Sequence, residues 1–159
     1  MNNGYEQLDS PDKGEGIFAI KQFHRGDIVM IGVIEKDNIE NHSHASQMGK
    51  FRYALHGGKI TKVNHSCNPN CGINLNITGA HDFVAMQTIE IGDEITFDYA
   101  MRNYTTEYFP YECRCGAGNC RGSITGWKSL PDSFKSKYKG FVAPYLIEID
   151  LRLNELAHH

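Results

Sequence analysis

The five cysteines of the sequence fall in two short segments, and their spacing favours metal binding over disulfide formation. Three of them, Cys113, Cys115 and Cys120, lie within eight residues, with two glycines between them. Thiolates at this spacing converge readily on one tetrahedral zinc ion, and an odd number of cysteines argues against a disulfide framework. A fourth thiolate has to come from Cys67 or Cys71. The competing interpretation is a set of unrelated buried thiols, which behave as small apolar groups.

Three further segments carry residue types that bind ligands or take part in reactions. Residues 64–70 (NHSCNPN) are rich in side chains that form hydrogen bonds, and residues 92–99 end in Tyr99. In the third segment, Gly14 and Gly16 flank a single residue, so that a ligand could approach the backbone closely. The ordinary alternatives are a hydrogen-bonded turn, a core tyrosine with a satisfied hydroxyl, and a hairpin turn, respectively. The occurrence of all three segments in this order is not easily produced by chance.

The composition permits a hydrophobic core and excludes several functional classes. The chain has 159 residues, of which 40% are hydrophobic, and this suggests one domain with at most a small appended module. The net charge of −3 argues against sequence-independent nucleic-acid binding and mildly favours a cationic partner. No stretch approaches the length of a membrane span, and the polar N-terminus lacks the apolar segment of a signal peptide. We therefore expect an intracellular protein, in the cytoplasm or nucleus, with non-standard secretion as the alternative.

The segments that must position these residues have the pattern of short strands. Residues 16–20, 27–34, 82–86 and 94–99 are short, apolar and rich in β-branched side chains, with turn-forming residues between them. Residues 36–50 are polar and irregular, which predicts a loop with room for a short helix.

Helical patterns occur only near the C-terminus. Ser129 is predicted to cap a helix that Gly140 ends, and residues 144–157 have apolar side chains at helical spacing. The apolar stripe of the second helix consists of Leu146, Ile149, Leu153 and Leu156. Such a stripe indicates core packing more often than a helix that binds a partner.

The set of motifs resembles the SET-domain protein lysine methyltransferases over residues 14 to 122. The glycines before Ile17 resemble the family's opening motif, residues 64–70 match its most specific motif in full, and residues 95–99 match the motif of its catalytic tyrosine. The cysteines from Cys113 onward resemble the family's post-SET zinc knuckle. The resemblance implies a mainly β, SET-type (β-clip) fold, with several small twisted sheets around a knot-like core and a C-terminal helical segment.

For function, the resemblance implies S-adenosylmethionine-dependent transfer of methyl groups to the side-chain amine of lysine in a protein. A histone tail is one such substrate, and direct contact with nucleic acid is not expected. The SET domain would occupy residues 8–112, the post-SET zinc knuckle 113–126 and a C-terminal helical extension 127–159. The implied cofactor-binding residues are Gly14, Glu15, Gly16, Asn64, His65 and Tyr99. One structural zinc ion would be held by Cys67, Cys113, Cys115 and Cys120, which leaves Cys71 spare.

The resemblance also assigns roles around the target amine. Tyr99 would align the methyl group with the amine, and Tyr53 would line the lysine channel, although a core tyrosine is equally expected there. Phe97 occupies the position that tunes how many methyl groups are added, and its lack of a hydroxyl favours di- or trimethylation. Free lysine has a pKa of about 10.4, so desolvation in a narrow channel has to favour the neutral amine.

Two other functional interpretations stay open. One is a non-catalytic SET-like module that binds a peptide or partner, since fold alone does not determine function. The other is a zinc-ribbon nucleic-acid binder, against which the net charge of −3 counts.

Overall fold

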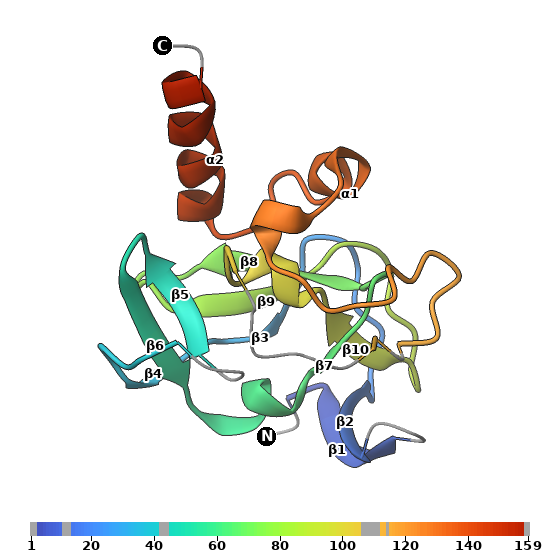
Figure 1. Cartoon of the computed structure of the whole chain (residues 1–159). Helices are drawn as coiled ribbons and strands as arrows, with labels where there is room; N and C mark the ends of the chain where they lie inside the picture. The colour runs from blue at the N-terminus through green and yellow to red at the C-terminus, as the bar shows by residue number, and fades with distance from the viewer. Residues whose placement is uncertain (1–2, 11–13, 42–44, 106–111, 114, 158–159) are drawn as a thin grey trace.

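Within the described part of the chain, three small β-sheets form the body, and two α-helices follow at the C-terminal end (Figure 1). This computed structural model describes residues 3–10, 14–41, 45–105, 112–113 and 115–157. The strands are β1 (Tyr5–Ser10), β2 (Gly14–Ala19), β3 (Ile28–Met30), β4 (Ile34–Lys36), β5 (Ala45–Gly49), β6 (Arg52–His56), β7 (Asn64–His65), β8 (Cys71–Leu75), β9 (His81–Ala85) and β10 (Glu94–Phe97). Their orders in the sheets are β1-β2-β10-β7, β3-β9-β8 and β4-β6-β5.

The first sheet joins the segments that the sequence singled out. β2 pairs antiparallel with both β1 and β10. β7 pairs in parallel with β10, with Asn64 opposite Thr96 and His65 opposite Phe97. Parallel strands need a long connection, and here β8 and β9, which belong to the second sheet, lie between β7 and β10 in the chain. The sheet therefore places residues 64–65 beside the segment that leads to Tyr99.

The expectation of one continuous strand over residues 27–34 is wrong. The segment forms two short strands, β3 and β4, which belong to different sheets. Between them the backbone N–H of Gly32 donates to Asp82 Oδ1 at 2.8 Å, and a Cβ on this glycine would lie 2.1 Å from the carbonyl oxygen of His81. The chain thus crosses directly against β9, and this close approach interrupts the strand.

The expectation of a loop over residues 36–50 is confirmed for residues 37–41 but wrong for residues 45–49, where β5 forms a hairpin with β6. β5 contains few of the β-branched residues that mark a strand. Its backbone is held instead by a distant side chain, because Asn103 Nδ2 donates to the Ala45 carbonyl at 2.8 Å and Asn103 Oδ1 accepts from the Gln47 N–H at 2.6 Å. Because this contact spans more than fifty residues, the local sequence of β5 contains no pattern that would predict the strand.

The first C-terminal helix differs from its prediction at the start. The 3-10 helix η3 (Trp127–Ser129) contains Ser129, and α1 (Asp132–Lys137) begins after Pro131 without a side-chain cap. The predicted serine cap is therefore wrong. Gly140 adopts a left-handed backbone, with φ of +87°, after α1 has ended.

The second helix, α2 (Pro144–Ala157), has the predicted range, but most of its apolar stripe does not pack in the core. Leu146 is buried, whereas Leu153 and Leu156 are 47% and 72% exposed. Figure 1 shows α2 projecting away from the sheets. The N-terminal half is anchored by Leu146 and by Asp150, whose carboxylate accepts hydrogen bonds from Tyr104, Trp127 and Lys135. The prediction of core packing is thus wrong beyond this half.

One hydrophobic core joins the sheets to the C-terminal segment. Many of its buried members come from β2, β3, β8, β9 and β10 and from the segment after residue 126, and they include Ile17, Met30, Ile73, Phe83, Ile95, Trp127, Tyr138 and Leu146. Burial of this apolar surface stabilises the packing of the C-terminal segment against the sheets. No helix in the described ranges is long and apolar enough to cross a membrane.

Candidate active site and metal centre

Asn64, at the start of β7, connects the first two motifs. Its side-chain amide donates to the Glu15 carbonyl at 3.0 Å and to Glu94 Oε2 at 2.8 Å. The glycine at position 16 makes this possible, because a Cβ there would lie 2.7 Å from Glu94 Oε2 and 3.1 Å from Asn64 Nδ2. The structure therefore brings Glu15 and Gly16 of β2 next to Asn64, and Gly14 precedes them at the start of the same strand. The region around Asn64 and Gly16 therefore contains backbone and amide groups suited to a polar ligand.

His65 links β7 to the segment of Tyr99. Its Nδ1 accepts a hydrogen bond from the Tyr99 backbone N–H at 3.1 Å. The proton of the neutral imidazole is therefore on Nε2, which lies 3.4 Å from Cys67 Sγ. His65 is buried, so its side chain connects the turn of Tyr99 with one of the clustered cysteines.

Tyr99 lies directly after β10, in the 3-10 helix η2 (Tyr99–Met101). Its ring centroid is 5.1 Å from that of His65 and 5.0 Å from that of Phe97, and the Arg102 guanidinium lies 4.7 Å from it. Burial raises the pKa of the Tyr99 hydroxyl, and the positive charge of Arg102 lowers it by less. The hydroxyl is therefore protonated at neutral pH and can form an oriented hydrogen bond.

β10 ends at Phe97, two residues before the end of the predicted strand 94–99, and Asp98 follows it as the cap of η2. Its fully buried carboxylate caps η2 by accepting from the Ala100 N–H at 3.0 Å. Arg121 donates two hydrogen bonds to it, at 2.7 and 2.9 Å, and the Tyr138 hydroxyl donates a third at 2.8 Å. Sequence reasoning missed both donors, although Arg121 directly follows the last clustered cysteine.

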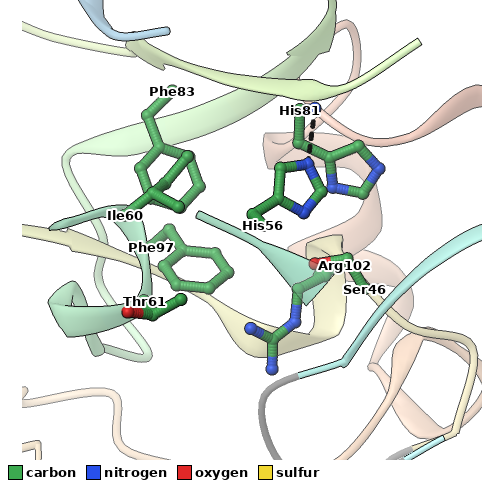
Figure 2. Close-up of a pocket in the computed structure, with 8 residues that line it drawn as sticks. All are labelled: Ser46, His56, Ile60, Thr61, His81, Phe83, Phe97 and Arg102. Atoms are coloured by element: carbon green, nitrogen blue, oxygen red, sulfur yellow. Dashed lines mark hydrogen bonds between the residues drawn. The ribbon is translucent and has the colours of Figure 1, made fainter. Parts of the chain in front are cut away.

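A small pocket lies beside Phe97 (Figure 2). Its apolar side contains Phe83, whose ring centroid is 4.6 Å from that of Phe97, and its polar side contains His56, His81 and Arg102. The volume of about 20 Å³ is enough for about one water molecule. Burial, helped by the charge of Arg102, lowers the pKa of His56 to about 4, so this histidine is neutral at neutral pH. No sequence motif had marked the two histidines.

Tyr53 is placed differently from Phe97. It lies on β6 opposite Gln47, whereas Ala54 lies opposite Ser46, which lines the pocket. Because side chains alternate along a strand, Tyr53 and the pocket-lining His56 project from opposite faces. The structure thus does not bring Tyr53 into the pocket beside Phe97, and its assignment to the lysine channel stays a prediction.

The four cysteines assigned to zinc come together. The sulfur atoms of Cys67, Cys113, Cys115 and Cys120 all lie within 4.8 Å of one another. Burial raises the pKa of Cys67, and backbone N–H groups that donate to three of these sulfurs offset part of the cost of a buried thiolate. Cys71 is buried in the hydrophobic core instead, where burial raises its pKa to about 12. Four sulfurs at this spacing match the donor set and size of a tetrahedral zinc site.

Comparisons with known proteins agree with this geometry. A family model for the SET domain matches residues 14–100. The chain is 40% identical over 73 residues to an H3 lysine-36 specific histone-lysine N-methyltransferase of Mycosarcoma maydis, covering 44% of this chain and 7% of that protein. It is 33% identical over 141 residues to the histone-lysine N-methyltransferase Set2 of Drosophila melanogaster, covering 76% of this chain and 6% of that protein. The chain thus spans less than a tenth of either relative.

A solved structure shares the arrangement of the sheets. The crystal structure of a candidate histone methyltransferase from Plasmodium falciparum aligns with a TM-score of 0.52 and 20% identity, covering 61% of this chain and 93% of that one. At this identity the likeness concerns the fold alone.

Proposed function

The chain belongs to the SET-domain family, and on this premise we propose that it is an S-adenosylmethionine-dependent protein-lysine N-methyltransferase. Its small sheets confirm the mainly β, SET-type fold that the motifs implied. The observation that carries the proposal is the junction of β7 and β10, where Asn64 and His65 lie beside the segment of Tyr99. Asn64, His65 and the glycine edge of β2 would hold the cofactor, whose sulfonium supplies the methyl group.

The residues around Tyr99 support transfer to an amine. A lysine ammonium has to lose a proton before it can attack, and apolar surroundings favour the neutral form. Phe97 and Phe83 supply such surroundings on one side of the pocket, and the positive charge of Arg102 on the other side also disfavours an ammonium. The protonated Tyr99 hydroxyl would orient the amine for in-line attack, and such positioning reduces barriers by several kcal/mol, up to about 7–11 in ideal cases.

We also propose that the four clustered cysteines hold one zinc ion. Four thiolate ligands leave no open coordination position, so the role of the ion would be structural. It would tie Cys67, next to the motif of Asn64 and His65, to the segment from Cys113 to Cys120.

For the substrate, we propose a lysine in a basic protein segment, with a histone tail as the first candidate. Both relatives are named as histone-lysine methyltransferases, and the name of the Mycosarcoma maydis protein specifies H3 lysine 36. The net charge of −3 is compatible with a cationic substrate. A histone substrate would place the protein in the nucleus.

The test is incubation of the purified chain with labelled S-adenosylmethionine, a panel of histones and total cell lysate. Label should enter protein with the native chain and with Tyr5→Phe, a tyrosine on β1 outside the site, but not with Tyr99→Phe. Binding of the cofactor without transfer to any protein would favour the non-catalytic SET-like module. Failure to bind the cofactor at all would refute the proposed function.

A further inference from the structure

We propose that Arg121 and Tyr138 are positioning residues for Tyr99, which they hold in place through the carboxylate of Asp98. This inference rests on the proposed function for its kinetic test, but it concerns a contact network that can be measured without activity. Arg121 and Tyr138 both lie beyond residues 14–100, the part that the family model matches.

Asp98 is held more tightly than a simple helix cap requires. Its two oxygens accept three side-chain hydrogen bonds, two from the Arg121 guanidinium and one from Tyr138, all between 2.7 and 2.9 Å. The carboxylate and Tyr138 are fully buried. Paired, charge-assisted bonds of this kind fix geometry as well as contributing free energy. Asp98 is therefore immobilised by residues that lie far from it in the sequence.

The helix that carries Tyr99 depends on Asp98. η2 has three residues, and such a short 3-10 helix has little stability of its own. Besides the backbone bond from the Met101 N–H to the Asp98 carbonyl, two side-chain contacts hold its first turn: Asp98 Oδ1 accepts from the Ala100 N–H, and His65 Nδ1 accepts from the Tyr99 N–H. If Asp98 rotates, the turn loses one of these contacts, and the tyrosine ring is displaced with it.

Contacts within the C-terminal segment hold the two donors, Arg121 and Tyr138, in position. The Arg121 guanidinium lies 4.8 Å from the ring centroid of Phe134 on α1, which supports its planar group. The Arg121 backbone N–H points to Cys67 Sγ at 3.5 Å, so that the cysteine cluster fixes the start of this side chain. Tyr138 follows α1 directly and belongs to the hydrophobic core. The network thus connects the metal centre and the C-terminal segment to the position of Tyr99.

The sharpest test compares Tyr138→Phe with Tyr104→Phe. Both variants keep the ring and remove a tyrosine hydroxyl that donates to a carboxylate at 2.8 Å, to Asp98 in the first case and to Asp150 in the second. Since a hydrogen bond to a charged group is substantial, kcat should fall about tenfold in Tyr138→Phe, with KM for the cofactor changed by less than about twofold. Tyr104→Phe should leave both constants near those of the native chain.

Amide hydrogen exchange of residues 98–102 gives the readout that does not need activity. Exchange there should rise in Tyr138→Phe and not in Tyr104→Phe, with zinc content unchanged in both. Equal exchange in the two variants, or a rise in KM without a fall in kcat, would overturn the inference. A native chain that binds the cofactor but transfers no methyl group would refute the proposed function, while the exchange comparison would still decide the role of Tyr138.

Arg121 is tested with two substitutions because its removal leaves Asp98 as a buried, unpaired charge. Arg121→Met should lower kcat more than Tyr138→Phe does, and Arg121→Lys, which keeps the charge but not the paired bonds, should recover part of the loss. If Arg121→Met does not fold, Arg121→Lys alone is compared with the native chain. Native kcat and native exchange in Arg121→Lys would contradict a role for the paired geometry.

Discussion

Replacing Gly16 by alanine should weaken cofactor binding without breaking the fold. The new Cβ would lie 2.7 Å from Glu94 Oε2 and 3.1 Å from Asn64 Nδ2, both closer than real Cβ atoms normally lie. Gly16 is not among the glycines with a left-handed backbone, so alanine adds no backbone strain there. The effect of Gly16→Ala should therefore come from the displacement of these two side chains.

The magnitude follows from the hydrogen bonds of Asn64. The new Cβ would displace the Glu94 carboxylate, because the end of this side chain is flexible. The 2.8 Å hydrogen bond from Asn64 Nδ2 to Glu94 would then be lost. A hydrogen bond to a charged group contributes about 1.5–3 kcal/mol, and partial exposure brings this one to about 1–2 kcal/mol. Asn64 keeps its 3.0 Å bond to the Glu15 carbonyl, so its side chain is loosened but not released. A loss of about 1.4 kcal/mol at the cofactor site corresponds to a tenfold weaker affinity.

Calorimetric titration with S-adenosylmethionine measures this affinity, and urea unfolding measures the free energy of unfolding. The matched control is Gly79→Ala, in the turn between β8 and β9, where φ is +87° and a Cβ would meet nothing within 4 Å. That control should cost about 1–2 kcal/mol of stability through backbone strain and leave the affinity unchanged. Native cofactor affinity in Gly16→Ala would refute the assignment of Asn64 to the cofactor site.

Three further outcomes are expected. Elemental analysis should find one zinc ion per chain, lost in Cys115→Ser and retained in Cys71→Ser; retention in both would place the metal elsewhere. Single-turnover assays should show a loss of about 10² or more in rate for Tyr99→Phe with cofactor binding intact, and near-native turnover would mean that another residue aligns the amine. Mass spectrometry should find di- or trimethyl-lysine with the native chain and a shift toward monomethyl-lysine with Phe97→Tyr, whose hydroxyl can hold a water molecule beside the amine; a native chain that stalls at monomethyl-lysine contradicts this role of Phe97.

The sequence motifs predict only part of the candidate site, and the fourth ligand of the proposed zinc site is an example. Spacing alone left Cys67 and Cys71 as equal choices for the fourth sulfur, and only the resemblance favoured Cys67. In the structure, Cys67 lies near the end of β7, where the chain meets the segment of Cys113, whereas Cys71 begins β8 with its side chain in the core. Four residues of separation thus decide between a metal ligand and a core thiol, and that choice depends on tertiary position.

Other parts of the molecule could not be predicted because their determinants are distant. β5 is polar and is held by Asn103, and the break between β3 and β4 depends on contact with β9. The exposed end of α2 has the same periodicity as a buried helix, since amphipathic spacing does not say whether the apolar face is covered. Local patterns predicted elements where propensity and burial agreed, as in β2 and β9, whereas for α2 the periodicity predicted the range but not the burial.

The arrangement around Tyr99 limits which groups can take the proton of the target amine. Asp98 precedes Tyr99 in the chain, and His65 contacts the Tyr99 backbone, so these two side chains are the nearest candidates for a general base. In the structure, both Asp98 oxygens accept hydrogen bonds from Arg121, and His65 Nδ1 accepts the Tyr99 N–H while Nε2 faces Cys67. A carboxylate or imidazole whose lone pairs are occupied by buried donors is a poor general base, because proton uptake would break those bonds. Methyl transfer at this site should therefore depend on desolvation and alignment of an already neutral amine, with its proton released to solvent before attack.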